Sequence, residues 1–133
     1  QEILKISAGI ASAAQHLHQR GIMHGDLYAH NILVNPKSHS ILGDFGAASF
    51  YDETDKDFGQ ALERIEVRAF GCLLEDLLDR CLKKAEHTVE KTVYHQLRQL
   101  QQACMAPEAN RRPFFRSICQ TLSTLSASVC SPA

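Results

Sequence analysis

Residues 24–46 read HGDLYAHNILVNPKSHSILGDFG, the most informative stretch of the chain. Two short apolar runs, at 32–34 and 40–42, flank a polar segment at 35–39 that contains asparagine, proline and serine. Apolar runs joined by such turn-forming residues predict two brief strands in a hairpin. A hairpin brings the residues before its first strand close to the residues after its second. The polar residues at the two ends of this stretch are therefore expected to lie together.

Three of these polar residues suit a reaction at a phosphate group. Phosphoryl transfer needs a residue that orients the attacking hydroxyl and accepts its proton, and it needs divalent cations beside the phosphates. Asp26 suits the first task, and Asn31 and Asp44 offer the hard oxygen ligands that Mg²⁺ prefers. We expect His24 to hold the loop near Asp44, and Gly46 to let the chain turn sharply after it.

Helices are predicted around this stretch from apolar residues at helical spacing. Residues 3–18 form the first helix, and Gly21 ends it. Residues 62–82 carry so wide an apolar stripe that this helix is expected to be contacted from several sides. Residues 90–105 form a third helix, and Pro113 opens a fourth. The predicted fold class is mainly α with a small β-hairpin element, an α+β arrangement.

The composition excludes several classes of protein. The chain has 133 residues, is 44% hydrophobic and 22% charged, and carries a net charge of −1. These values predict one globular domain, and they argue against global disorder and against a nucleic-acid partner. No apolar run reaches the length of about 18 residues that a membrane span needs. The five cysteines form no CxxC pair, which favours reduced thiols in a cytoplasmic protein over a disulfide framework or a zinc site.

The motifs at 24–31 and 44–46 resemble the catalytic and metal-binding loops of eukaryotic-type protein kinases. Those loops read H-x-D-L-x-x-x-N and, further along the chain, D-F-G. By this resemblance the whole chain, residues 1–133, is similar to the C-terminal lobe of a kinase domain and is expected to fold as a single domain. Residues 47–65 then match an activation-segment-like loop, and residues 66–126 match the helical remainder.

The resemblance implies a role for each matching residue. Asp26 would be the catalytic base, and Asn31 and Asp44 would hold Mg²⁺ beside the phosphates of ATP. His30 would add positive charge near the γ-phosphate when it is protonated. The remaining matches are supporting positions in the loops and in the later helices: His24, Phe45, Gly46, Glu66 and Arg112.

Two long-range contacts are implied at the supporting positions. Glu66 stands where the family has an aspartate that supports the backbone of the catalytic loop, and a glutamate can accept the same hydrogen bonds. Glu63 is expected to pair with Arg112, as the corresponding residues do in the family. A weaker likeness, in residues 24–33 and 42–49, is to kinase domains attached to leucine-rich repeats.

The chain also departs from the family pattern. It has no G-x-G-x-x-G loop and no V-A-I-K lysine before the first helix, so we expect the N-terminal lobe to be missing. Gly25 replaces the arginine that pairs with a phosphorylated activation loop, and Tyr28 stands where serine/threonine kinases carry lysine. The segment 47–65 is short, which predicts a reduced platform for a peptide substrate.

Three functions fit these residues. The first is transfer of the γ-phosphoryl group of ATP to a hydroxyl of a protein substrate, with an N-terminal lobe or a partner chain completing the site. The second is a non-catalytic pseudokinase scaffold, favoured by the missing lobe and the short segment 47–65. The third is a small-molecule phosphotransferase of the same fold, favoured by the H-G-D sequence at 24–26. The isolated chain is expected to be inactive or very weakly active.

Overall fold

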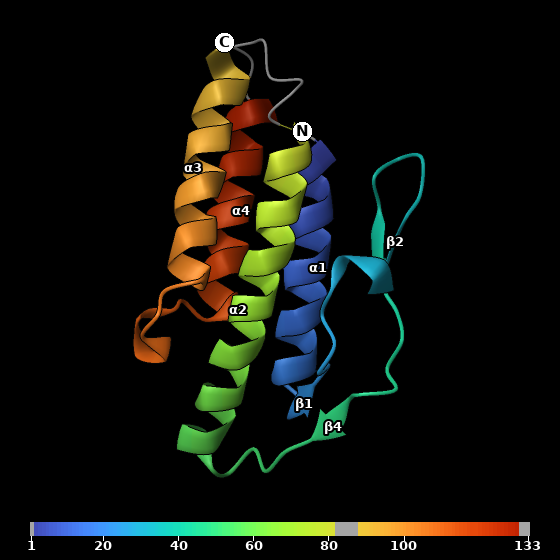
Figure 1. The fold of residues 1–133 in the computed structure, drawn as a ribbon, viewed down its shortest axis with the longest axis vertical. Helices are drawn as coiled ribbons and strands as arrows, with labels where there is room; N and C mark the ends of the chain where they lie inside the picture. The colour runs from blue at the N-terminus through green and yellow to red at the C-terminus, as the bar shows by residue number, and fades with distance from the viewer. Residues whose placement is uncertain (1, 82–87, 131–133) are drawn as a thin grey trace.

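Figure 1 shows a computed structural model in which helices dominate and the strands are short. The structure describes residues 2–81 and 88–130. In chain order the elements are α1 (Glu2–His18), β1 (Ile22–Met23), the 3₁₀ helix η1 (Ala29–Asn31), β2 (Ile32–Val34), β3 (Ser40–Leu42), β4 (Ser49–Phe50), α2 (Lys56–Cys81), α3 (Thr88–Cys104), the 3₁₀ helix η2 (Ala109–Arg111) and α4 (Phe115–Cys130). The predicted fold class, mainly α with a small hairpin, is confirmed.

The helices pack as a bundle in which α2 touches several neighbours. Helix α1 packs against α4 and α2, while α2 also packs against α3, β1 and η2. The apolar stripe of α2 enters the core, where Val67, Phe70, Leu74 and Leu78 are fully buried. Phe115, at the start of α4, meets Phe70 edge to face with ring centroids 5.9 Å apart. The predicted central position of the second helix is therefore confirmed.

The predicted hairpin is formed by β2 and β3, which pair antiparallel in the register Ile32↔Leu42 and Val34↔Ser40. It projects beside α1 in Figure 1, and the Ser40 hydroxyl ties it there by donating to the main-chain oxygen of Ile6 at 3.1 Å. Its turn is closed by the Asn35 side chain, whose Oδ1 accepts the main-chain N–H groups of residues 37 and 39. Turn chemistry and apolar patterning thus agree with the observed pairing.

A second strand pair, β1 with β4, was not predicted. It joins Ile22 to Phe50 and Met23 to Ser49 in antiparallel register. Each strand has only two residues, which is too short to show the alternation by which a strand is recognised in a sequence. This pair nevertheless holds the chain that follows the Asp44-Phe45-Gly46 motif against the end of α1.

The loop that the resemblance implies at 47–65 is helical in residues 56–65, so the helix predicted from residue 62 starts earlier, at Lys56. The helix starts after Asp55, whose Oδ1 accepts the main-chain N–H of Phe58 at 3.1 Å as a helix cap. None of residues 56–65 is fully buried. Phe58, Ala61, Leu62 and Ile65 nevertheless recur at helical spacing, so the sequence of this part of the chain carried a helix pattern that the loop assignment overlooked. The loop between β4 and α2 is therefore only residues 51–55.

The other helix boundaries lie close to their predicted positions. Helix α1 starts one residue before the predicted range, and α3 starts at Thr88. The predicted end of the second helix at residue 82 lies outside the described residues. Helix α4 continues to Cys130, beyond the predicted helical limit at 126. No helix within residues 2–81 and 88–130 combines the length and the apolarity that crossing a membrane requires.

We predict that Leu74→Ala lowers the free energy of unfolding by about 2–5 kcal/mol, because it leaves a cavity beside fully buried neighbours. The matched control is Leu33→Ala on the hairpin, where the leucine is 69% exposed and the change should stay within about 0.5 kcal/mol. Urea unfolding followed by circular dichroism measures both. Equal effects of the two substitutions would contradict the assignment of α2 to the core.

Candidate functional site

The hairpin sets Asn31 opposite the start of the Asp44-Phe45-Gly46 motif. The strand pairing continues one step beyond Ile32 and Leu42, because the main-chain N–H of Gly43 donates to the main-chain oxygen of Asn31 at 2.8 Å. Asp44 directly follows Gly43 in the chain. The two candidate metal ligands, far apart in sequence, are therefore neighbours at the open end of the hairpin.

Asp26 and Asn31 are joined directly. The Nδ2 group of Asn31 donates to the main-chain oxygen of Asp26 at 2.7 Å and to its Oδ2 at 2.8 Å. Asn31 is 8% exposed, while the Asp26 side chain is 32% exposed and open to a substrate. Because both bonds use the amide nitrogen, the Oδ1 of Asn31 remains an acceptor that can bind a cation.

Asp44 lies in an unusual backbone conformation. Its φ angle is +52°, a region in which non-glycine residues are uncommon, although aspartate enters it more often than most, and in which functional residues are often held. Its Oδ1 accepts the main-chain N–H of Gly46 at 3.2 Å, and the residue is exposed. In the described chain no hydrogen bond joins the carboxylate of Asp44 to the side chain of Asp26 or Asn31. The carboxylate is therefore free to bind a ligand that enters beside the loop.

His24 is fully buried and ties the loop to the motif that follows the hairpin. Its Nε2–H donates to the main-chain oxygen of Gly43 at 2.8 Å, and its Nδ1 accepts the main-chain N–H of Asp26 at 3.2 Å. These two partners require the neutral ring with its proton on Nε2. Phe45 covers the ring edge to face, with centroids 4.9 Å apart. The structure thus gives His24 the contacts that would hold Asp26 close to Asp44.

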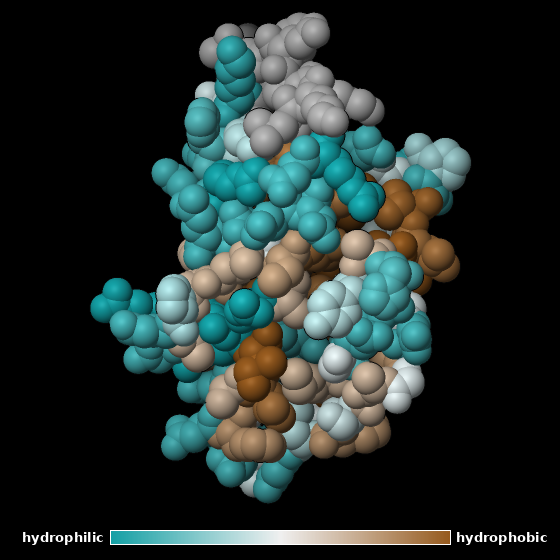
Figure 2. Space-filling model, in the orientation of Figure 1, coloured by the Kyte–Doolittle hydropathy of each residue, from teal (hydrophilic) through white to brown (hydrophobic). Residues whose placement is uncertain are grey.

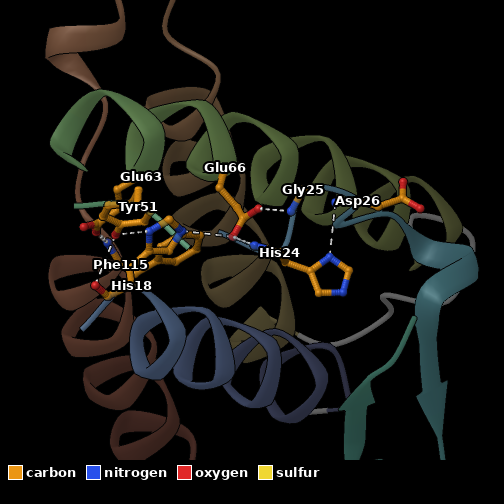
Figure 3. Close-up of polar contacts among 8 residues, drawn as sticks. All are labelled: His18, His24, Gly25, Asp26, Tyr51, Glu63, Glu66 and Phe115. Carbon is orange, nitrogen blue, oxygen red and sulfur yellow. Dashed lines mark hydrogen bonds and ion pairs between the residues drawn. The ribbon is translucent and has the colours of Figure 1, made fainter. Parts of the chain in front are cut away.

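Glu66, in the middle of α2, supports the backbone of this loop (Figure 3). Its Oε1 accepts the main-chain N–H of His24 at 3.0 Å, and its Oε2 accepts that of Gly25 at 2.9 Å. Burial alone would raise the pKa of Glu66, but hydrogen bonds from His18, Gly25 and His24 outweigh it and lower the pKa below the ordinary value of 4.5. The carboxylate is therefore held in its ionised form, although the residue is only 2% exposed.

Sequence reasoning missed His18 and Tyr51, which complete this network. His18 Nε2 lies 2.9 Å from Glu66 Oε1, and its Nδ1 lies 2.8 Å from the Tyr51 hydroxyl. The His18 ring also stacks on Phe115 with centroids 5.7 Å apart. A signal existed for His18, since it continues the buried face of α1 four residues after Ala14. Tyr51 carried no such signal, because it lies in a loop.

Gly25 occupies the position at which the family pattern has arginine. Its φ angle is +84°, and a Cβ placed there would lie 2.5 Å from the main-chain oxygen of Ala47. No other residue fits without a shift of the backbone. The loop passes so close to Ala47 that the arginine of the family pattern would not fit at this position with the backbone as it is.

His30 lies beside the candidate base. Its Nε2 is 3.9 Å from Asp26 Oδ2, and its side chain is 70% exposed. The ring of Tyr28 stacks on that of His30 with centroids 5.7 Å apart and planes 9° apart. The predicted cation therefore faces the same open space as Asp26, and Tyr28 orients it from the other side.

The hypothesis of a Glu63–Arg112 ion pair is wrong. Arg112 donates to the main-chain oxygens of Ala106 and Arg64 at 2.8 and 3.1 Å, so it ties the turn before α4 to α2. Glu63 accepts the main-chain N–H of Phe115 at 2.8 Å. A carboxylate at the first turn of a helix satisfies an otherwise unpaired N–H group and suits the helix dipole, which explains why Glu63 caps α4 instead.

A metal ion at this site would have few protein ligands. Among residues 2–81 and 88–130 no group of three or more histidine, cysteine, aspartate or glutamate side chains is arranged to hold one. Asp44 and the amide oxygen of Asn31 supply two hard oxygen ligands. Two protein ligands, together with water and phosphate oxygens, match the way proteins bind Mg²⁺.

Comparisons with known proteins agree with the motifs. Residues 1–64 match the family model of the protein kinase domain. Serine/threonine-protein kinase AtPK1/AtPK6 of Arabidopsis thaliana is 46% identical over 50 residues, which are 38% of this chain and 11% of the relative. A probable LIM domain-containing serine/threonine-protein kinase of Dictyostelium discoideum is 26% identical over 157 residues, 95% of this chain and 24% of the relative.

A third relative is the probable inactive L-type lectin-domain containing receptor kinase III.1 of Arabidopsis thaliana. It is 34% identical over 89 residues, which are 60% of this chain and 14% of the relative. The chain therefore spans between 11% and 24% of the length of these three proteins. The resemblance to eukaryotic-type protein kinases is confirmed, whereas the likeness to kinases with leucine-rich repeats stays a prediction.

We predict that Glu66→Gln destabilises the chain by about 1.5–3 kcal/mol near neutral pH, because charge-assisted hydrogen bonds become neutral ones. The folded-state pKa of Glu66 lies below the ordinary value of 4.5. The stabilisation is therefore fully present above 4.5 and is lost as the pH falls through the folded-state pKa. We expect urea unfolding to show that the difference in the free energy of unfolding between wild type and variant shrinks from about pH 7 to about pH 3.

A gap that stays constant across this range would contradict the assignment of an ionised carboxylate to Glu66. The matched control is Glu108→Gln, an exposed glutamate whose partner is Arg111 at 3.0 Å on the surface. This control should change the free energy of unfolding little at any pH, since exposed ion pairs contribute little.

Proposed function

We propose that this chain, whose sequence is related to that of the protein kinases, takes part in transferring the γ-phosphoryl group of ATP to a protein hydroxyl. The observation that carries the proposal is the pair of hydrogen bonds by which Asn31 holds the half-buried Asp26. This pairing holds a candidate base against one candidate metal ligand, Asn31, and His24 links the same loop to Gly43, the residue before the other candidate ligand, Asp44. The chain spans only a small part of its relatives, so the activity of the whole protein is part of the proposal.

Asp26 is proposed as the group that orients the substrate hydroxyl. Its Oδ2 is engaged by Asn31, so its other oxygen is available to accept the hydroxyl proton. The hydroxyl oxygen then bonds to the γ-phosphorus, and the bond between that phosphorus and the bridging oxygen of ADP breaks. Because His24 holds the main-chain N–H of Asp26, the carboxylate keeps its place while the proton moves.

Asn31 and Asp44 are proposed as the residues that hold Mg²⁺ with ATP. Their oxygens are hard ligands, and neither oxygen needed for binding is taken up by a side-chain partner elsewhere in the described chain. When bound, the ion offsets the charge of the phosphates. His30, when protonated, adds a positive charge 3.9 Å from Asp26, where serine/threonine kinases use a lysine from a nearby position.

An N-terminal lobe or a partner chain is proposed to complete the nucleotide site. The hairpin beside Asn31 exposes apolar side chains, with Leu33 69%, Ile41 65% and Val34 45% exposed. Apolar surface gathers on that side of the molecule in Figure 2. A contiguous apolar surface of this kind is typical of a contact with another protein or with a ligand.

A pseudokinase scaffold is the second candidate, favoured by the short loop before α2. Only residues 51–55 separate β4 from that helix, which leaves little chain for holding a peptide substrate. The aligned part of the Dictyostelium relative is 157 residues, longer than this whole chain of 133, so that relative carries residues that this chain lacks. One relative is itself named as probably inactive.

A small-molecule phosphotransferase is the third candidate. Gly25 gives the H-G-D sequence, and its φ of +84° shows that the backbone there requires glycine. A small substrate would also need less of a peptide platform than a protein substrate.

We predict that Mg·ATP binds to the chain and that Asp44→Asn weakens the binding at least about tenfold, because the amide is a poorer ligand for Mg²⁺ than the carboxylate. Isothermal titration calorimetry measures both. The matched control is Asp57→Asn, an exposed aspartate in the first turn of α2, which should bind as the wild type does.

An assay of phosphoryl transfer distinguishes the three candidate functions. In the protein that contains this sequence, Asp26→Asn should abolish transfer and leave Mg·ATP binding in place if Asp26 is the base. Binding without transfer in the wild type would favour the scaffold. Transfer to a small alcohol, with none to protein, would favour the small-molecule enzyme. An absence of binding at millimolar nucleotide would contradict the proposed role of Asn31 and Asp44 in the chain alone.

A further inference from the structure

Tyr51 is fixed in place by contacts on three sides. Its main-chain N–H donates to the main-chain oxygen of Gly21 at 2.8 Å, which extends the β1–β4 pairing. Its ring lies against Gly59 of α2, where a Cβ would come within 3.0 Å of the ring. Its hydroxyl reaches the C-terminal end of α1, where it meets both the ring and the main chain of His18. The position of this hydroxyl is therefore set by the fold rather than by a flexible loop.

The direction of each hydrogen bond around His18 follows from which of the two atoms carries a proton. The Tyr51 hydroxyl lies 3.1 Å from the main-chain oxygen of His18, which can only accept, and 2.8 Å from Nδ1 of the same residue. A hydroxyl has one proton, so if it goes to the carbonyl the hydroxyl oxygen accepts a proton from Nδ1. On the other side of the ring, Nε2 faces the Glu66 carboxylate at 2.9 Å and must also donate.

We infer that Tyr51 keeps His18 doubly protonated, and that the resulting His18–Glu66 ion pair positions the catalytic loop. Tyr51 and His18 would touch neither ATP nor the substrate, so both are positioning residues. They act through Glu66, whose two oxygens hold the main-chain N–H groups of His24 and Gly25 just before Asp26. Figure 3 shows this line of contacts from Tyr51 to the loop.

Burial makes the charge of His18 important. The side chains of His18 and Glu66 are only 3% and 1% exposed. A buried carboxylate that loses its positive partner is strongly destabilised and tends to take up a proton. A protonated Glu66 has one oxygen fewer to accept the N–H groups of the loop. The imidazolium therefore preserves the form of Glu66 that can hold both.

Three carboxylates and one aromatic ring surround the contact between Tyr51 and His18. Helix α2 contributes Glu66 and Glu63, the loop after β4 contributes Glu53 near Tyr51, and α4 contributes the uncharged ring of Phe115. Burial, with the negative charges of Glu63, Glu66 and Glu53, raises the pKa of Tyr51 to about 12. The hydroxyl therefore keeps its proton at neutral pH and can donate it to the main-chain oxygen of His18.

The test is nitrogen-15 NMR of the histidine rings in the whole chain at about pH 7. We expect His18 to show protons on both ring nitrogens, with the exposed His16 as an internal reference. In Tyr51→Phe the Nδ1 group loses its acceptor, so we expect His18 to lose a proton. A single proton on Nε2 of wild-type His18 would overturn the inference, since Tyr51 would then donate to Nδ1.

Hydrogen exchange tests the effect on the loop. We expect the main-chain amides of His24 and Gly25 to exchange about tenfold faster in Tyr51→Phe, because their shared acceptor is weakened. The matched control is Tyr94→Phe, which removes a hydroxyl bonded to Arg98 at 2.6 Å on α3. Tyr94→Phe should change neither the ring protons of His18 nor the exchange of the His24 and Gly25 amides. Unchanged exchange at these amides in Tyr51→Phe would overturn the link between Tyr51 and the loop.

The positioning role rests on the proposed function, but these two measurements do not. If the chain binds no nucleotide while both NMR results hold, the proposed function fails and the network stands. If turnover exists and Tyr51→Phe leaves both kcat and the ring protons unchanged, the network has no positioning role. We expect Tyr51→Phe to lower kcat about tenfold with little change in KM for ATP, since it misplaces the base rather than the metal ligands.

Discussion

The buried carboxylate of Glu66 is the contact on which the geometry of the loop at residues 24–31 depends. It lies in the central helix α2 and accepts hydrogen bonds from the loop on one side and from His18 of α1 on the other. An isolated buried carboxylate would be costly, and here each oxygen has partners that offset the loss of water. The helix bundle and the loop are thereby joined at one point. Movement of α2 against α1 would be transmitted to the backbone that carries Asp26.

The hairpin solves a different problem, that of bringing distant residues together. Its pairing extends to Asn31 and Gly43, so the main chain of Asn31 lies next to the residue that precedes Asp44. The His24 side chain then bonds to the main chain of Gly43, and the Asn31 side chain bonds to Asp26. The helix bundle and the hairpin therefore fix the site from opposite sides. The hairpin also exposes an apolar face beside the site, where a nucleotide or another part of a kinase would fit the proposed function.

The start of α2 shows how a sequence can favour the wrong local structure. None of residues 56–65 is fully buried, and the resemblance to the kinase pattern assigned them to a loop, although Phe58, Ala61, Leu62 and Ile65 stand at helical spacing. They are helical because Asp55 caps them and because the rest of α2 continues the same helix into the core. Glu63 illustrates the same limit, since its partner is the start of α4 and not Arg112. Contacts between elements far apart in sequence depend on how those elements pack, which no local pattern encodes.

The amino-acid sequence predicted the motifs at 24–31 and 44–46, the hairpin between them and the apolar stripes of the helices. Each depends on residue type at short, regular spacing, which is the information that a sequence carries directly. The partners of Glu66, the positive φ angles at Gly25 and Asp44, and the Tyr51–His18 contact were not predicted. They arise where α1, α2 and the chain after β4 converge, and a residue's neighbours there are set by the packing of the whole bundle. The residues of the candidate site could therefore be predicted from local sequence patterns, whereas the contacts that support them depend on the tertiary structure.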